Sequence, residues 1–163
     1  GDLCRMSAGD RGGTAGNVPM VFRRAEMRDL DGLCVVENAC FSPPWSRASM
    51  ESTLTGDGRC VLLAEEAGRT VGYASYWRVL EEADVLSVAV LPEFRRQGIG
   101  MALMGALLTQ AKSESVEIVH LEVRRSNVTA QSLYERCGFA ADGLRPRYYS
   151  RPTEDAVLMS CRL

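Results

Sequence analysis

The segment Arg95-Arg96-Gln97-Gly98-Ile99-Gly100 combines two arginines with a Gly-x-Gly pattern. It follows the strand-like run Val85–Val90 and opens a helix-like run at Ile99. A helix N-terminus carries partial positive charge, so arginines are unfavourable there unless an anion is also present. Glycines at this point let backbone N–H groups approach a ligand closely. The pattern therefore indicates a bound phosphate or diphosphate, and the alternative is a tight strand-to-helix turn without a ligand.

Glu122 interrupts the otherwise apolar strand-like segment Ile118–Val123. Strand alternation places Glu122 on one face together with Ile118 and His120. A carboxylate in the centre of a strand is costly to desolvate unless something uses it, and a general base is one such use. His120 is given at most a supporting role. The alternative for Glu122 is an ion pair with a neighbouring arginine, and the candidates are Arg124, Arg125 and Arg147.

Asn127 and Tyr134 lie seven residues apart on one expected helix and therefore share a face. The phenol of Tyr134 is a candidate proton donor to a leaving thiolate, because its reference pKa is about 10 against about 8.5 for a thiol. Its alternative is a core aromatic with the hydroxyl at the surface. Asn127 stands at the expected N-cap, so simple capping is its alternative.

The acidic residues Glu81, Glu82 and Asp84 fall in and just after an expected turn. Charges in hairpin turns are usually only solvated. The functional interpretation is a site for a basic segment of a substrate.

Strands and helices must hold these residues in place, and the sequence pattern predicts which segments form them. Expected strands cover residues 21–24, 60–65, 70–80, 84–90, 117–123, 139–143 and 155–162, and expected helices cover 27–39, 46–54, 98–112 and 127–137. This order predicts an α/β (α+β) fold with a mixed sheet and helices on both faces. The glycine-rich turn falls at the carboxyl end of the strand over 84–90, where such sheets bind ligands.

Length and composition suit one soluble domain of 163 residues with a net charge of −2, which argues against a general nucleic-acid binder. No apolar run approaches the roughly 20 residues of a membrane span, and a cytoplasmic location is expected. The chain has one histidine and six cysteines without a C-x-x-C pair, so no metal site is expected and the thiols should be reduced. Residues 1–19 are expected to be a disordered leader or an expression remnant, and residues 20–163 one domain.

The motifs together resemble the GCN5-related N-acetyltransferase (GNAT) superfamily. The turn Arg95–Gly100 is similar to the family's acetyl-CoA diphosphate loop, and the match continues through Leu121–Asn127 and Leu133–Phe139. The segments Phe41–Ser46, 79–83 and 147–149 resemble one branch, the bacterial ribosomal-protein alanine N-acetyltransferases (RimI). The resemblance spans about residues 20–163 and implies the GNAT fold, with six to seven strands flanked by about four helices.

The resemblance implies a role for each matching position. Glu122 would act as base, directly or through water, and Tyr134 as acid. Acetyl-CoA, the co-substrate, would be held by Val88, Ala89, Val90, Arg95, Arg96, Gln97, Gly98, Ile99, Gly100, Met101, Asn127 and Tyr134. The acceptor would be contacted by Trp45, Glu81, Glu82, Asp84 and Tyr148.

The implied activity is direct acetyl transfer to the N-terminal alanine of small-subunit ribosomal protein eighteen, whose N-terminal segment is basic. Cys137 is rejected as a nucleophile, because it stands at the C-terminal end of its expected helix, where the dipole does not lower a thiol pKa. Two alternatives stay open: acetylation of lysine or small amines, and a non-catalytic module that binds acetyl-CoA. The expected partners are the ribosomal-protein segment and coenzyme A, without direct nucleic-acid or membrane contact, and a monomer is expected.

Overall fold

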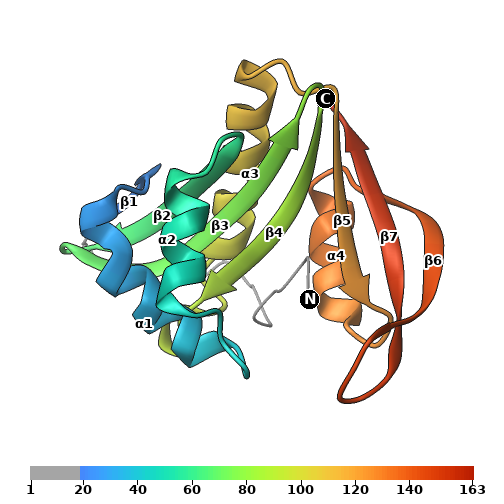
Figure 1. Cartoon of the computed structure of the whole chain (residues 1–163), viewed down its shortest axis with the longest axis horizontal. Coiled ribbons are helices and arrows are strands. Elements are labelled where there is room, and N and C mark those ends of the chain that lie inside the picture. Colours follow the sequence, from blue (N-terminus) through green and yellow to red (C-terminus); the bar gives the residue numbers. More distant parts are fainter. Residues whose placement is uncertain (1–18) are drawn as a thin grey trace.

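Figure 1 shows the computed structural model of the chain, which describes residues 19–163. Its elements are β1 Met20–Arg24, a 3-10 turn Met27–Asp29, α1 Leu30–Cys40, α2 Arg47–Thr55, β2 Arg59–Glu66, β3 Arg69–Val79, β4 Glu82–Val90, a second 3-10 turn Pro92–Phe94, α3 Ile99–Ser113, β5 Ile118–Arg124, α4 Val128–Arg136, β6 Ala140–Tyr149 and β7 Glu154–Arg162. The expected leader lies, apart from Pro19, outside the described residues, and the division at residue 20 stays a prediction.

The described strands form one seven-stranded sheet in the order β1-β2-β3-β4-β5-β7-β6. Only β4 and β5 pair in parallel, and every other neighbouring pair is antiparallel. The crossover between the parallel strands passes through α3, as a parallel connection requires. The predicted mixed sheet is therefore confirmed.

The helices cover both faces of the sheet, with α1 and α2 in front of β2–β4 in Figure 1 and α3 behind. Two tyrosines of β3 mark the two faces. The Tyr73 hydroxyl donates to Glu37 of α1, and the Tyr76 hydroxyl donates to Glu114 just after α3. Leu33, Leu63 and Leu103 are fully buried and belong to one core that spans both layers.

The parallel strands β4 and β5 pair over only three residues each, Glu82–Asp84 with Ile118–His120. Beyond these pairs the two strands separate, and Figure 1 shows the V-shaped gap between them. Within residues 19–163, β4 from Val85 onward therefore has no strand paired on its β5 side, whereas β3 pairs with its other side. A strand edge that is opened in this way can pair with a ligand.

A β-bulge at Leu86 accompanies this separation. Ser87 lies opposite Ser75, whereas Val85 lies opposite Tyr76, so Leu86 is an extra residue in β4. A bulge bends its strand and increases the local twist. The bulge therefore helps β4 to turn away from β5.

Two strand boundaries differ from the expected ones by more than one residue. The turn before β4 consists of Leu80 and Glu81 alone, so Glu82 and Ala83 belong to the strand rather than to the turn. Leu80 takes a positive φ of 55°, a conformation that two-residue hairpins need but that leucine rarely signals. The expected strand over 139–143 extends to Tyr149, because the outer strand β6 absorbs its breaker residues through two register shifts. No helix in the part of the chain described is long and apolar enough to cross a membrane.

Candidate active site

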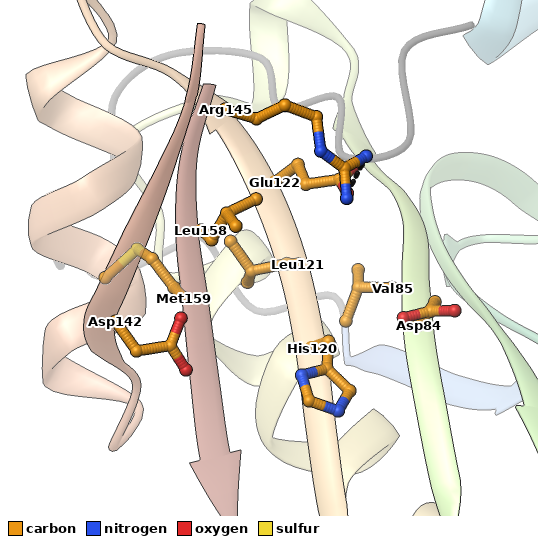
Figure 2. Close-up of a pocket in the computed structure, with 9 residues that line it drawn as sticks. All are labelled: Asp84, Val85, His120, Leu121, Glu122, Asp142, Arg145, Leu158 and Met159. Carbon is orange, nitrogen blue, oxygen red and sulfur yellow. Dashed lines mark ion pairs between the residues drawn. The ribbon is translucent and has the colours of Figure 1, made fainter. Parts of the chain in front are cut away.

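A pocket of about 310 Å³ lies where β4 and β5 separate (Figure 2). Its lining comes from β4, β5, β6 and β7 and comprises Asp84, Val85, His120, Leu121, Glu122, Asp142, Arg145, Leu158 and Met159. Acidic side chains outnumber basic ones in this lining, which suits a pocket for an amine or another cationic group. Asp84 and Glu122, two of the residues predicted from the sequence, meet here.

Glu122 lies on β5 with its side chain 13% exposed. Strand alternation is confirmed, because Val119, Leu121 and Val123 are buried on the opposite face. The Oε1 atom of Glu122 lies 3.1 Å from Nη1 of Arg145 on β6. The Oε2 atom is buried and has no hydrogen-bond partner among the described residues. Glu122 thus has one oxygen in an ion pair and one oxygen available to accept a proton.

The alternative interpretation of Glu122, an ion pair with an arginine, is present in the structure, but its partner Arg145 is not one of the three arginines considered from the sequence. Arg124 instead pairs with Glu154, and Arg125 pairs with Asp155, each at 3.4 Å. Arg124 and Arg125 were plausible candidates because they are close to Glu122 in sequence. Arg145 reaches Glu122 only because β6 lies beside β7, which lies beside β5.

The acidic residues near the pocket are not equivalent. Nε2 of His120 lies 3.2 Å from Oε1 of Glu82, and a supporting role for His120 stays a prediction. Desolvation raises the pKa of Asp84; the nearby Glu122 and Glu82 add to this rise and His120 opposes it. Glu81 remains in the exposed turn outside the pocket lining.

The start of α3 has the geometry that its sequence predicts. Arg96 and Gly98 take positive φ values of 65° and 81°, and the N-cap residue Gly98 contributes no capping side chain. The first N–H groups of a helix have no partner within that helix. They can therefore hold the diphosphate of a coenzyme A thioester. This fit supports roles for Gln97, Ile99, Gly100 and Met101, which stay predictions.

The side chain of Arg95 is hydrogen-bonded to β4, whereas that of Arg96 is exposed. The Nε atom of Arg95 donates to the carbonyl oxygen of Val90 at 3.1 Å, and the thiol of Cys40 donates to the same oxygen at 3.3 Å. Arg95 therefore fixes the end of β4, next to the backbone of Val88, Ala89 and Val90, where the acyl carrier is expected to lie.

Tyr134 lies on α4, behind the strands that line the pocket, and Asn127 is the N-cap residue of this helix. Oδ1 of Asn127 accepts from the Ala130 amide at 3.1 Å, so the capping interpretation is confirmed. Tyr134 is fully buried, and its ring is tilted against Phe139 at a centroid distance of 5.9 Å. The alternative that its hydroxyl reaches the surface is therefore wrong, while its role as acid stays a prediction. Burial raises the pKa of the Cys137 thiol, in line with its rejection as a nucleophile.

Several polar residues of this face were missed from the sequence. Asp142 and Arg145 enter the pocket from β6, and only the register of the outer strands reveals this. Glu37 of α1 is 1% exposed; its Oε1 accepts from the Trp45 amide at 2.8 Å, and its Oε2 accepts from the Tyr73 hydroxyl. Trp45 is thereby fixed at a second, more open groove of about 450 Å³ between α2 and Leu86.

No group of three or more His, Cys, Asp or Glu side chains that could hold a metal ion lies within residues 19–163. The five cysteines of this range form no disulfide. The pocket itself offers carboxylates that can transfer protons, and it lies beside the turn expected to bind an anion.

A separated strand pair next to a helix start that can bind phosphates is the arrangement of a transferase that takes an acyl group from coenzyme A. Comparison with known proteins agrees with this class. The model of the Acetyltransferase (GNAT) family matches residues 30–139, and the chain belongs to this family. It is an acetyl-CoA-dependent N-acetyltransferase, as the motifs predicted.

The chain is similar to the [ribosomal protein bS18]-alanine N-acetyltransferase of Haemophilus influenzae, with 34% identity over 146 residues that cover 88% of this chain and 99% of that protein. The Escherichia coli (strain K12) enzyme of the same name is 34% identical over 139 residues, 83% of this chain and 92% of the relative. The crystal structure of the ribosomal-protein-S18-alanine N-acetyltransferase from Escherichia coli superposes with a TM-score of 0.82 at 31% identity and covers 88% of this chain and 94% of that one. The resemblance to this branch is confirmed.

Proposed function

We propose that this protein transfers acetyl from acetyl-CoA to the N-terminal alanine of small-subunit ribosomal protein bS18. The relatives that carry this activity in their names match the chain over most of their length. The observation that carries the proposal is Glu122, whose Oε2 is buried at the strand separation and has no partner among the described residues. Such an oxygen can take the proton of an incoming amine.

In the proposed reaction the neutral amine attacks the acetyl carbon while Oε2 of Glu122 accepts its proton, directly or through a water. The N–H group of Val90 polarises the thioester carbonyl. The C–S bond then breaks, and the leaving thiolate takes a proton from Tyr134. Arg96–Met101 hold the diphosphate, and Asn127 lies near the carrier arm.

An N-terminal amine suits this site better than lysine does. An α-amino group has a pKa of about 7.7–8.0 against about 10.4 for lysine, so deprotonating lysine at neutral pH costs roughly 3 kcal/mol more. One carboxylate with one available oxygen is a modest base. The acidic side chains of Glu82 and Asp84 would face the basic residues that follow the acceptor alanine.

The test is coenzyme A release with a short peptide that begins with alanine and continues with basic residues. The same peptide with a blocked N-terminus and a lysine peptide with a blocked N-terminus serve as controls. We expect release with the first peptide alone, and mass spectrometry should place one acetyl group on its α-amine. Release with the lysine peptide would instead favour the lysine alternative, and acetyl-CoA binding without release on any peptide would favour the non-catalytic module.

A further inference from the structure

Arg145 is the one described residue that forms an ion pair with the proposed base, and neither the motifs nor the comparisons give it a role. Its guanidinium reaches from β6 to Oε1 of Glu122, as the dashed line in Figure 2 shows. We propose that Arg145 is a positioning residue: it occupies Oε1, and thereby leaves Oε2 as the single oxygen presented to the acceptor amine. This inference rests on the proposed function of Glu122.

The guanidinium of Arg145 is itself held in place. It lies over the ring of Tyr148 with 5.1 Å between Cζ and the ring centroid. The rings of Tyr148 and Tyr149 meet edge-to-face, with 5.0 Å between their centroids. Arg124 of β5 lies over the Tyr149 ring, with 4.5 Å between its Cζ and the ring centroid. Stacking on aromatic rings restrains an otherwise flexible arginine. The series from Arg145 to Arg124 therefore links β6 back to the strand that carries Glu122.

Register explains why this arginine reaches the base. Glu122 lies opposite Leu158 of β7, and Arg145 lies opposite Ala156, two residues along the same strand. Residues two apart on a strand share a face, so Arg145 crosses β7 on the face of Glu122. Asp142, the other charged residue of β6 in the pocket, accepts instead from the Ser160 hydroxyl at 2.6 Å.

The consequence concerns the transfer step more than binding. The amine proton moves to Oε2, the N–C bond forms, the C–S bond breaks, and the thiolate takes a proton from Tyr134; Arg145 changes no bond. Without Arg145, the carboxylate of Glu122 can rotate, and only part of its orientations face the amine. Poor orientation of a reacting group lowers kcat and leaves cofactor binding intact.

The test measures kcat and both KM values for Arg145→Gln, Arg145→Lys, Glu122→Gln and the Arg145→Gln/Glu122→Gln double variant. Arg147→Gln is the matched control, because it removes the same charge from the same strand and its guanidinium forms no ion pair with another described residue. We expect Arg145→Gln to lower kcat on the order of tenfold with both KM values kept, because only orientation is lost. Arg145→Lys should restore part of this loss, and Arg147→Gln should be unchanged.

The double variant decides between positioning and a merely structural role. If Arg145 acts through Glu122, its replacement has no further effect once Glu122 is glutamine. Multiplying losses in the double variant, or an effect confined to the KM of the peptide, would overturn the inference. Absence of coenzyme A release by the unaltered protein would overturn the proposed function first, so the two failures are distinguishable.

Discussion

Glu37 of α1 and Glu122 of β5 are two carboxylates on the same side of the sheet, and they differ in how many of their oxygens have a partner. Both oxygens of Glu37 accept from neutral donors, the Tyr73 hydroxyl and the Trp45 amide. Among residues 19–163, only one oxygen of Glu122 has a partner, and that partner is the charged Arg145. A fully paired buried carboxylate holds a structure together, whereas a half-paired one at a pocket is available for chemistry. Hydrogen bonding thus separates the two roles where residue type does not.

Replacing the half-paired carboxylate should produce the largest effect. We expect Glu122→Gln to lower kcat by roughly 10²–10⁴-fold, because the amide cannot accept the amine proton. Acetyl-CoA affinity, measured by calorimetry, and the unfolding midpoint should both stay close to those of the unaltered protein. Normal turnover of the Glu122→Gln variant would contradict the difference in role between the two residues, because Glu122 would then have no catalytic function.

Tyr134 tests whether complete burial excludes a catalytic role. The residue is as buried as Glu37 but is predicted to act in catalysis as Glu122 does. Tyr134→Phe keeps the ring that packs on Phe139, so stability should change little, while kcat should fall by roughly 10²-fold if the phenol protonates the thiolate. Single-turnover rates with acetyl-CoA measure this. Full activity would make Tyr134 a packing residue.

Replacing Glu37, the carboxylate with both oxygens paired, should affect stability rather than turnover. Glu37→Leu keeps much of the side-chain volume but removes both acceptors, so it should lower the free energy of unfolding by roughly 2–4 kcal/mol. Glu37→Gln is the matched control, since its amide can still accept from Trp45 and donate to the Tyr73 oxygen. Urea unfolding followed by circular dichroism measures both variants. Equal stability of the leucine variant would show that the buried pairings contribute nothing.

Asp84 should give the smallest effect, visible only in the pH dependence of stability. Its pKa is raised mainly by desolvation, so the folded state binds a proton more tightly than the unfolded state does. Stability contributed by this group is therefore lost as the pH rises through the unfolded and then the folded pKa. Asp84→Asn should raise the Tm slightly at pH 7 and leave it unchanged at pH 3. The shift is small because the side chain is only partly desolvated, and the remaining solvent screens its charge. A lower Tm at pH 7 would show that Asp84 is stabilised as an anion.

Most of the fold followed from local sequence patterns. The apolar alternation of β5, the glycine turn before α3 and the Asn127 cap are signals within a few residues of one another. Such signals predicted the elements and the anion-binding turn, because backbone geometry and burial act locally.

The remainder depends on contacts between distant segments. Glu37 has the appearance of an ordinary polar helix residue, and its partners Trp45 and Tyr73 become evident only in three dimensions. Arg145 lies 23 residues from Glu122, and two register shifts in β6 decide which of its residues enter the pocket. Register is set by packing across the sheet, which no single strand encodes.

The extra residue Leu86 determines which face of the sheet each side chain in the first half of β4 points to. A residue inserted in a loop would not change this. Side chains alternate along a strand, so one surplus position exchanges front and back for everything that precedes it. Glu82 and Asp84 consequently share a side with His120 and Glu122, while Val88 and Val90 keep their apolar side toward α3. Deletion of Leu86 would turn the side chains of Glu82 and Asp84 toward helix α3. The pocket between β4 and β5 would then lose the negative charge that β4 supplies. The chain can therefore tolerate a change of length at an exposed turn far better than at this one strand position.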